Sequence, residues 1–233
     1  MTSRPILFRN ARLIDPASAT ETRGALLVQD GAIADLGANL ASAPDGAEIL
    51  DCGGKVLAPG LVDMRAFFGE PGAEHRENIR SGSMAAAAGG VTTVVCSPET
   101  DPVIDDPAIV DYLLRRARDT SVVRMHPAAA LTKGLRGQEM TEIGLLKMAG
   151  AVCFTDGARS IASPRVMLRA LTYARDFDAL IVHHTEDADL AGNGVMNSGE
   201  YCSRLGLSGR PIEAETIMLE RDARLVRLTR SRY

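Results

Sequence analysis

Side chains that could bind a metal ion or transfer protons follow five apolar stretches of the sequence. They include Asp63, Glu99, Asp156 and the pair His183-His184. Histidine and carboxylate groups are the usual ligands of catalytic zinc and are common general acids and bases. In barrel enzymes such groups stand at the carboxyl ends of neighbouring parallel strands. The sequence therefore predicts a candidate site at strand ends, provided that the five stretches are such strands.

Two kinds of pattern along the chain indicate two domains. Residues 1–55 hold short apolar or alternating runs separated by turn signals, among them Asp30-Gly31, which favours a hairpin. After residue 55, strand-like runs alternate with helix-length segments, as they do in parallel βαβ units. We therefore expect a small β-sandwich-like module over 1–55 and an α/β domain over 56–233.

The elements of the second domain can be bounded approximately. Asp106-Pro107 and Ser163-Pro164 each join a capping side chain to a proline at the first helical position, which marks a helix start. The expected strands are 56–64, 91–97, 122–129, 151–155 and 180–184. The expected helices are 74–88, 106–119, 139–149, 164–176 and 211–224.

Five strand–helix units are too few to close an eight-stranded barrel. An open doubly wound sheet could also use five units, but no Gly-x-Gly-x-x-Gly motif follows the first strand, so a dinucleotide site is not indicated. The pattern favours an α/β fold of the partial TIM-like (β/α) barrel type. Its open edge strand near His184 and its exposed apolar interior should promote association, so we expect an oligomer or a bound partner.

Composition excludes several classes of protein. Hydrophobic residues make up 45% of the chain and the formal net charge is −4, which leaves no basic footprint for nucleic acid. No apolar run approaches the roughly 18 residues that cross a bilayer. Residues 1–12 lack the apolar stretch and cleavage site of a signal peptide. We expect a cytoplasmic protein that binds neither nucleic acid nor a membrane.

Several motifs in the second domain resemble those of the dihydroorotases, a branch of the amidohydrolase superfamily. They are Glu70-Pro71-Gly72, His126-Pro127, Leu131-Thr132-Lys133-Gly134 and Gly194-Val195-Met196-Asn197. With the five strand ends in this order, the resemblance covers essentially the whole chain. It implies an amidohydrolase-type barrel and a place in pyrimidine biosynthesis. Members of this family close N-carbamoyl-aspartate reversibly to dihydroorotate, using zinc held by strand-end histidine and aspartate.

The metal motif implied by the resemblance is incomplete in this sequence. Asp156 matches the aspartate ligand of the fourth strand, and His184 matches the histidine ligand of the fifth. Arg65 and Phe67 stand in the places of the two histidines of the family's His-x-His motif. A guanidinium stays protonated and offers a metal no lone pair, and a phenyl ring has no donor atom. Because catalytic zinc has about three protein ligands, we expect zinc to be absent or weakly bound.

The substrate positions of the family are changed as well. The family binds the substrate carboxylate with an arginine and an asparagine, and Gly69 and Glu99 stand in these places here. A carboxylate at position 99 would repel an anionic substrate. We therefore expect no catalytic residues in this chain. Rebuilding the carboxylate clamp is expected to require Gly69→Arg together with Glu99→Asn.

The histidines outside the implied metal site are interpreted as structural or solvated groups. His183 is expected to pack or to support a neighbouring residue, and His126 precedes a proline at a strand end. His75 opens a segment rich in charges, so it is expected to be solvated or to cap a helix.

Two functional hypotheses follow, with a gene fragment lacking a stable fold as a third reading. In the first, the chain is a dihydroorotase-like pseudoenzyme of pyrimidine biosynthesis. It is similar to non-catalytic homologues that lack His-x-His and assemble with aspartate carbamoyltransferase, which implies a scaffold role. In the second, it is an active dihydroorotase or another metal-dependent cyclic amidohydrolase. A working metal site would then need new ligands at strand ends, for which Glu99 and Asp101 are the candidates.

Overall fold

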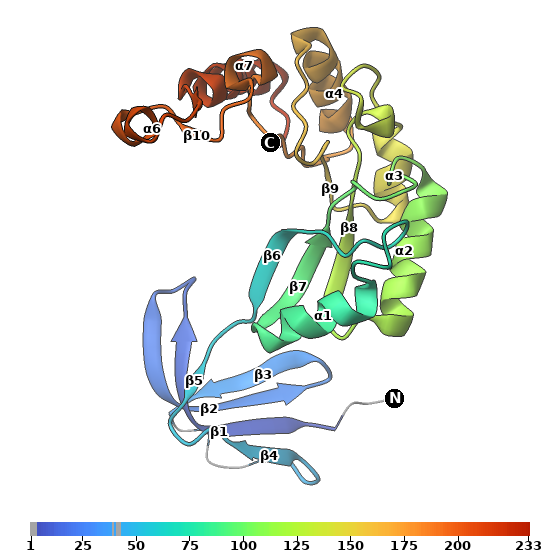
Figure 1. Ribbon diagram of the computed structural model, residues 1–233. Helices are drawn as coiled ribbons and strands as arrows, with labels where there is room; N and C mark the ends of the chain where they lie inside the picture. The colour runs from blue at the N-terminus through green and yellow to red at the C-terminus, as the bar shows by residue number, and fades with distance from the viewer. Residues whose placement is uncertain (1–3, 39, 41–42) are drawn as a thin grey trace. The chain divides into compact units, whose positions relative to one another are not determined.

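The computed structural model describes residues 4–38, 40 and 43–233 of the chain. The chain divides into two compact units, which part between Gly60 and Leu61. The first unit consists of strands, and in the second unit strands and helices alternate (Figure 1). Residues 56–60, which the sequence pattern assigns to the α/β domain, belong to the first unit.

In the first unit, the described residues form five strands: β1 (Ile6–Asp15), β2 (Thr20–Gln29), β3 (Ala32–Gly37), β4 (Glu48–Asp51) and β5 (Val56–Leu57). They form one sheet in the order β3-β2-β1-β4, with β5 also paired with β1. Asp30 and Gly31 both have positive φ between the antiparallel strands β2 and β3, so the predicted hairpin is confirmed. The buried side chains Leu7, Ala25 and Leu27 form its core.

The second unit is built on a parallel sheet of β6 (Leu61–Ala66), β7 (Val91–Cys96), β8 (Arg124–Ala129) and β9 (Cys153–Phe154). The strands lie in sequence order. Parallel bridges from Phe154 to Ile181, and from Leu180 to Arg232, continue the sheet by two short segments. The sheet curls, with helices along one side (Figure 1), so the predicted partial (β/α) barrel is confirmed.

Five helices of more than six residues alternate with these strands or follow them in the described residues. They are α1 (Ile79–Ala88), α2 (Pro107–Thr120), α3 (Ile143–Ala149), α4 (Pro164–Asp176) and α7 (Glu213–Thr229). Shorter elements are the 3-10 turn η1 (Lys133–Leu135), α5 (Ala188–Ala191), β10 (Met196–Asn197), α6 (Glu200–Leu205) and β11 (Gly209–Arg210).

Local sequence explains where these helices begin. The Asp106 side chain accepts from the N–H of Ala108, and that of Ser163 from Val166, so the two predicted proline-led starts are confirmed. The expected start of α1 at residue 74 is wrong, because Asn78 and Ser81 form a capping box that begins the helix at Ile79.

The first strand of the expected barrel also begins later than predicted. Val56 and Leu57 pair with Arg12 and Leu13 of β1, so they end the first unit. The strand that opens the parallel sheet starts only at Leu61.

The core of the second unit lies between the sheet and its helices. It is largely aliphatic, and its largest fully buried side chains include Ile79, Leu113, Leu146, Phe154 and Leu171. By contrast, among the described residues β6 pairs with β7 alone, and its side chains Leu61 and Met64 are 60% and 79% exposed. The sheet is thus covered by helices but open at β6.

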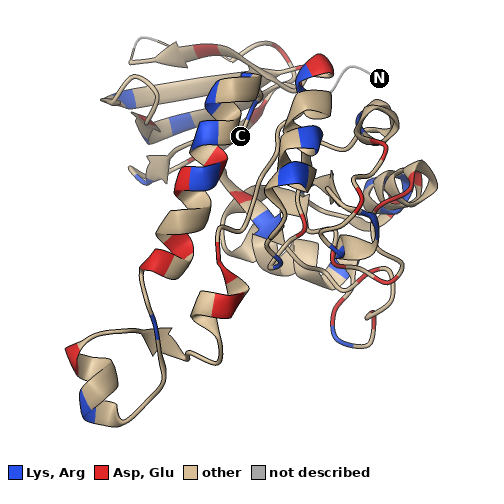
Figure 2. Cartoon of the chain, turned by 90° about the horizontal axis from the view of Figure 1, so that it is seen from above, with Lys and Arg blue, Asp and Glu red and all other residues tan. Residues whose placement is uncertain are grey.

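Charge is distributed along α7 in the direction that the helix dipole favours. Glu213 and Glu215 stand in the first turn and Arg227 in the last. Figure 2 shows the charged residues of the chain by sign. Among the described residues, no helix combines the length and the apolar character required to span a membrane.

Candidate functional site

The carboxyl ends of the parallel strands surround a small pocket of about 140 Å³ in the second unit. The pocket is lined by Met64, Arg65, Ser97, Ala128, Cys153, Thr155, Gly157, Val182, His183 and His184. Strand-end residues from all parts of the sheet therefore converge as predicted. Of the two predicted metal ligands, His184 lines this pocket, whereas Asp156 is not among its lining residues.

A charged contact joins the ends of β6 and β7 beside this pocket. The Arg65 Nη2 atom lies 3.4 Å from Glu99 Oε2. Glu99 also accepts hydrogen bonds from the Ser97 hydroxyl at 2.7 Å and from the backbone N–H of Ala158 at 3.0 Å. Burial acts to raise the pKa of Glu99, but the donors Ala158 and Ser97, with the Arg65 cation, hold it below its usual value. Glu99 is therefore an anion at neutral pH.

Gly157 lies directly against the Glu99 side chain. It has a φ of +66°, and a Cβ atom built on it would lie 2.2 Å from Glu99 Cδ. The position thus requires glycine both for its left-handed backbone and for the close approach of the carboxylate.

The Asp156 carboxylate is hydrogen-bonded within the protein. Its side chain is almost fully buried, and its Oδ1 atom accepts from the N–H groups of Leu131 and Thr132 at 3.0 and 2.8 Å. The Thr132 hydroxyl donates to Oδ2. Burial raises the pKa of Asp156, and these hydrogen bonds oppose that rise. Because a carboxylate has about four acceptor positions, most are occupied by the loop that follows β8.

The two adjacent histidines have different surroundings. The His184 side chain is 39% exposed, with Nε2 3.8 Å from Glu186 Oε1. The His183 side chain is buried: Nε2 accepts from the N–H of Ile161 at 2.8 Å, and Nδ1 lies 2.7 Å from Asp222 Oδ2. An Nε2 that accepts carries no proton, so the neutral ring donates from Nδ1 to Asp222. The structural role predicted for His183 is confirmed.

Asp222 is the centre of a buried polar network that the sequence pattern did not reveal. Besides His183, it is contacted by Arg221, with Nη2 2.7 Å from Oδ1, and by the Tyr233 hydroxyl, which donates to Oδ2 at 2.9 Å. Burial acts to raise the pKa of Asp222, but the hydrogen bonds from His183 and Arg221 outweigh it and lower that pKa. The network joins α7 to the segment that contains Ile181 and His183.

The Glu-Pro-Gly motif has a structural role in this chain. The buried Glu70 accepts from the N–H of Ile79 at 2.9 Å and pairs with Arg116 at 2.5 Å, which joins the start of α1 to α2. Gly69 has a φ of +70°, and a Cβ there would lie 2.7 Å from the carbonyl oxygen of Glu77. A side chain at position 69, as in the Gly69→Arg substitution expected to rebuild the carboxylate clamp, would therefore require the backbone to move.

The side chains at the strand ends determine whether this chain could bind the zinc ion of the family. In the part of the chain that the structure describes, no three His, Cys, Asp or Glu side chains are grouped to hold one metal ion. At the end of β6, Arg65 offers no lone pair and Phe67, 42% exposed, has no donor atom. Asp156 is committed to the loop after β8. These residues do not fit a catalytic zinc with about three protein ligands.

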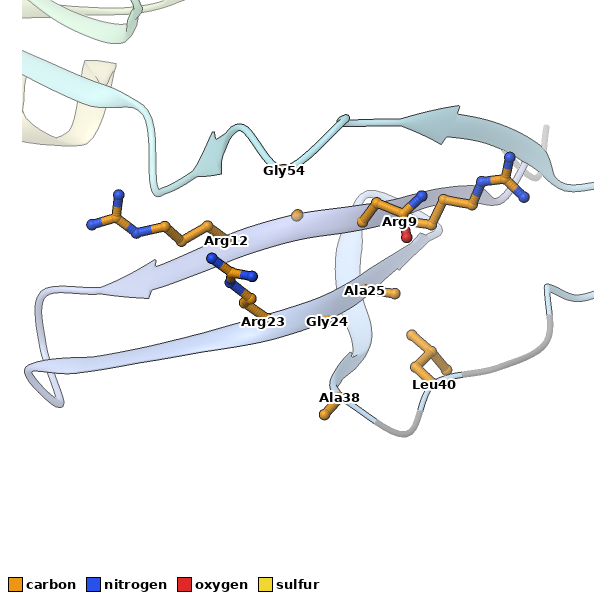
Figure 3. Close-up of a pocket in the computed structure, with 10 residues that line it drawn as sticks. Arg9, Arg12, Arg23, Gly24, Ala25, Ala38, Leu40 and Gly54 are labelled. Atoms are coloured by element: carbon orange, nitrogen blue, oxygen red, sulfur yellow. The ribbon is translucent and has the colours of Figure 1, made fainter.

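A second pocket, of about 450 Å³, lies wholly within the first unit (Figure 3). Arg12 and Arg23 stand opposite each other on β1 and β2 at its edge. Arg12 is paired with Glu21 at 2.5 Å, and Arg9, also in the lining, is 3.2 Å from Asp51. Carboxylates therefore already compensate two of its arginines.

Comparison with known families decides the relationship. The model of the family described as "Dihydro-orotase-like" matches residues 54–233. The chain belongs to this family. It is 43% identical over 229 residues to a dihydroorotase of Solibacter usitatus and 42% identical over 226 residues to one of Pelobacter propionicus. These alignments cover 98% and 97% of the chain but 53% of each relative, so this dihydro-orotase-like chain spans about half of their length.

Solved structures show the same fold. An L-hydantoinase (dihydropyrimidinase) from Arthrobacter aurescens superimposes with a TM-score of 0.78 at 22% identity, over 99% of this chain and 52% of the hydantoinase. A D-hydantoinase superimposes with a TM-score of 0.70 at 22% identity, over 97% of this chain and 50% of that structure. The dihydro-orotase-like chain therefore shares the fold of these hydantoinases over the part that it contains.

Proposed function

We propose that this chain is a dihydroorotase-like protein of pyrimidine biosynthesis that does not catalyse the family reaction and serves as a scaffold for aspartate carbamoyltransferase. The proposal rests mainly on the residues found at the end of β6. Arg65 and Phe67 stand in the places of the family's two histidines, and Arg65 faces Glu99. A fixed guanidinium cannot bind and ionise a water molecule as a metal does.

The substrate positions support the same proposal. The family binds the substrate carboxylate with an arginine and an asparagine, whereas Glu99 offers an anion no hydrogen-bond donor and is itself paired with Arg65. Gly69 has no side chain, and its surroundings leave no room for one. Within the described residues, the loss of the metal donors at the end of β6 and of the carboxylate clamp removes the family's groups for activating and holding a cyclic amide.

The exposed apolar strand β6 supports association of the chain with further protein surface. Large exposed apolar surfaces mark interaction sites, and Leu61, Val62 and Met64 are all more than half exposed. We propose that the chain is oligomeric or partner-bound in the cytoplasm. Aspartate carbamoyltransferase is the proposed partner because the chain resembles homologues that assemble with it.

Two measurements on the purified chain test the proposal. Dihydroorotate hydrolysis should not exceed the buffer rate, and tagged chain should retain aspartate carbamoyltransferase from its host. The matched variant is His184→Ala, because this half-exposed side chain can be removed without breaking a buried network. Turnover by the unmodified chain that His184→Ala abolishes would refute the loss of catalysis. Failure to retain the transferase at micromolar concentrations of both proteins would refute the partner.

An active cyclic amidohydrolase is the second candidate, and the name of the relatives, dihydroorotase, favours it. It would need new metal donors. Glu99, one of the two suggested from sequence, is held by Arg65, Ser97 and Ala158, and Asp101, the other, is exposed. One equivalent of tightly bound zinc after gel filtration, lost in His184→Ala, would favour this candidate.

A further inference from the structure

The two altered family positions at the strand ends contact each other. Residues 65 and 99 are 34 positions apart in sequence, yet the Arg65 guanidinium lies 3.4 Å from the Glu99 carboxylate. The strands that carry them are adjacent, with Ala66 in register with Cys96. Arg65 replaces a metal-binding histidine of the family, and Glu99 replaces its substrate-binding asparagine. Together the two replacements place opposite charges side by side.

Glu99 connects three segments of the chain. Its carboxylate receives Arg65 from the end of β6, the Ser97 hydroxyl from the end of β7 and the Ala158 N–H from the loop after β9. Gly157 leaves the space that the carboxylate occupies. The Glu99 side chain is only 27% exposed, so its position is fixed by these contacts. A fixed partner reduces the side-chain entropy that an exposed ion pair loses.

A metal ion in a protein joins the segments that carry its ligands, so that metal binding is coupled to folding. We propose that Arg65 is a built-in cation that takes over this joining role at the strand ends. Through the Glu99 carboxylate, it fastens β6 and β7 to the loop after β9 without a metal. This inference rests on the proposed absence of a catalytic metal but is independent of the proposed partner.

A double-mutant cycle tests the pair in the 233-residue chain. Arg65→Met removes the charge but keeps the length of the side chain, and Glu99→Gln removes the opposite charge. Apparent Tm is measured at one protein concentration, with EDTA and with added zinc. Each single variant should lower the apparent Tm by about 2–4 °C, and the double variant by no more than the larger single effect, because the two residues act as one unit.

The matched control is Arg115→Met, which breaks the exposed pair between Arg115 and Asp111, whose side chains are 60% and 61% exposed. It should change the apparent Tm by less than about 1 °C, since exposed pairs contribute little. Hydrogen exchange at Ala158 provides a second readout if a variant unfolds too readily for a cycle. In Arg65→Lys, which retains the charge, the Ala158 N–H should exchange with solvent more slowly than in Arg65→Met.

The outcomes separate this inference from the proposed function. Additive single effects, or an Arg65→Met variant equal to the Arg115→Met control, would overturn the built-in cation alone. A wild-type chain whose apparent Tm falls in EDTA and rises with stoichiometric zinc would overturn both. Insensitivity of the wild type to EDTA and zinc, with non-additive single effects, supports the inference.

Discussion

Asp156 offers the sharpest test of whether a residue at a family metal position now serves the fold. In Asp156→Ala, the Thr132 N–H and hydroxyl lose their acceptor. The Leu131 N–H keeps a contact with the Thr155 carbonyl at 3.2 Å. A buried donor left without a partner costs about 1–3 kcal/mol. Alanine also relieves the desolvation of a buried carboxylate, so we expect a net loss of about 2 kcal/mol, in the middle of that range.

This loss corresponds to a fall in apparent Tm of about 4–8 °C for a chain of this size. Asp156→Asn keeps a carbonyl oxygen for the two N–H groups, so it should fall about half as far. Asp119→Ala, at a side chain that is 67% exposed, is the control and should stay within about 1 °C. The assay is thermal unfolding followed by circular dichroism, with bound zinc measured in parallel. An Asp156→Ala protein as stable as the control would refute the reasoning, and loss of bound zinc at unchanged Tm would identify a ligand.

Two further predictions concern pH and the backbone. The pKa of Asp222 is lowered in the folded protein, so between that value and the ordinary 3.8 the folded state binds fewer protons than the unfolded state. The stabilisation from Asp222 is complete above about pH 3.8 and is lost as pH falls through the folded-state pKa. Urea unfolding between pH 6 and 3 should show a fall in the free energy of unfolding, and this fall should be smaller in Asp222→Asn. The same dependence of that free energy on pH in both proteins would contradict the prediction. Gly69→Ala should lower stability by more than the roughly 1–2 kcal/mol of a left-handed alanine, because its Cβ also meets the Glu77 carbonyl. Gly31→Ala, at a φ of +77° in open space, is the control, and equal losses in urea unfolding would count against the steric argument.

Sequence patterns predicted the parts of the fold that depend on neighbours in the chain. The proline-led starts of α2 and α4 and the Asp30-Gly31 hairpin are local signals, and all three are confirmed. The start of the first barrel strand was misplaced, because a short apolar run such as Val56-Leu57 does not reveal which sheet it joins. That choice depends on β1, more than forty residues earlier in the sequence.

The candidate site shows the same limit. Arg65 and Glu99 were each singled out from the sequence, but their contact depends on the register of β6 and β7 and was not foreseen. Asp222 gave no signal, since a charged residue within a helix normally faces solvent. Two of its partners, His183 and Tyr233, are 39 and 11 positions away in sequence. Asp156 was assigned to a metal by family position, whereas its hydrogen bonds are made within the fold.

The turn around Gly69 and Glu70 affects how alignments of such proteins should be interpreted. Glu70 joins the start of α1 to α2 through Ile79 and Arg116, and Gly72 has a φ of +101° beside the backbone of Asp101, where a Cβ atom would clash. Natural selection for a folded protein alone would preserve both positions. A Glu-Pro-Gly signature therefore does not distinguish working enzymes from inactive descendants, and a screen for lost activity should score positions 65, 67, 69 and 99. An arginine at position 69 of this chain would require a different backbone for the turn.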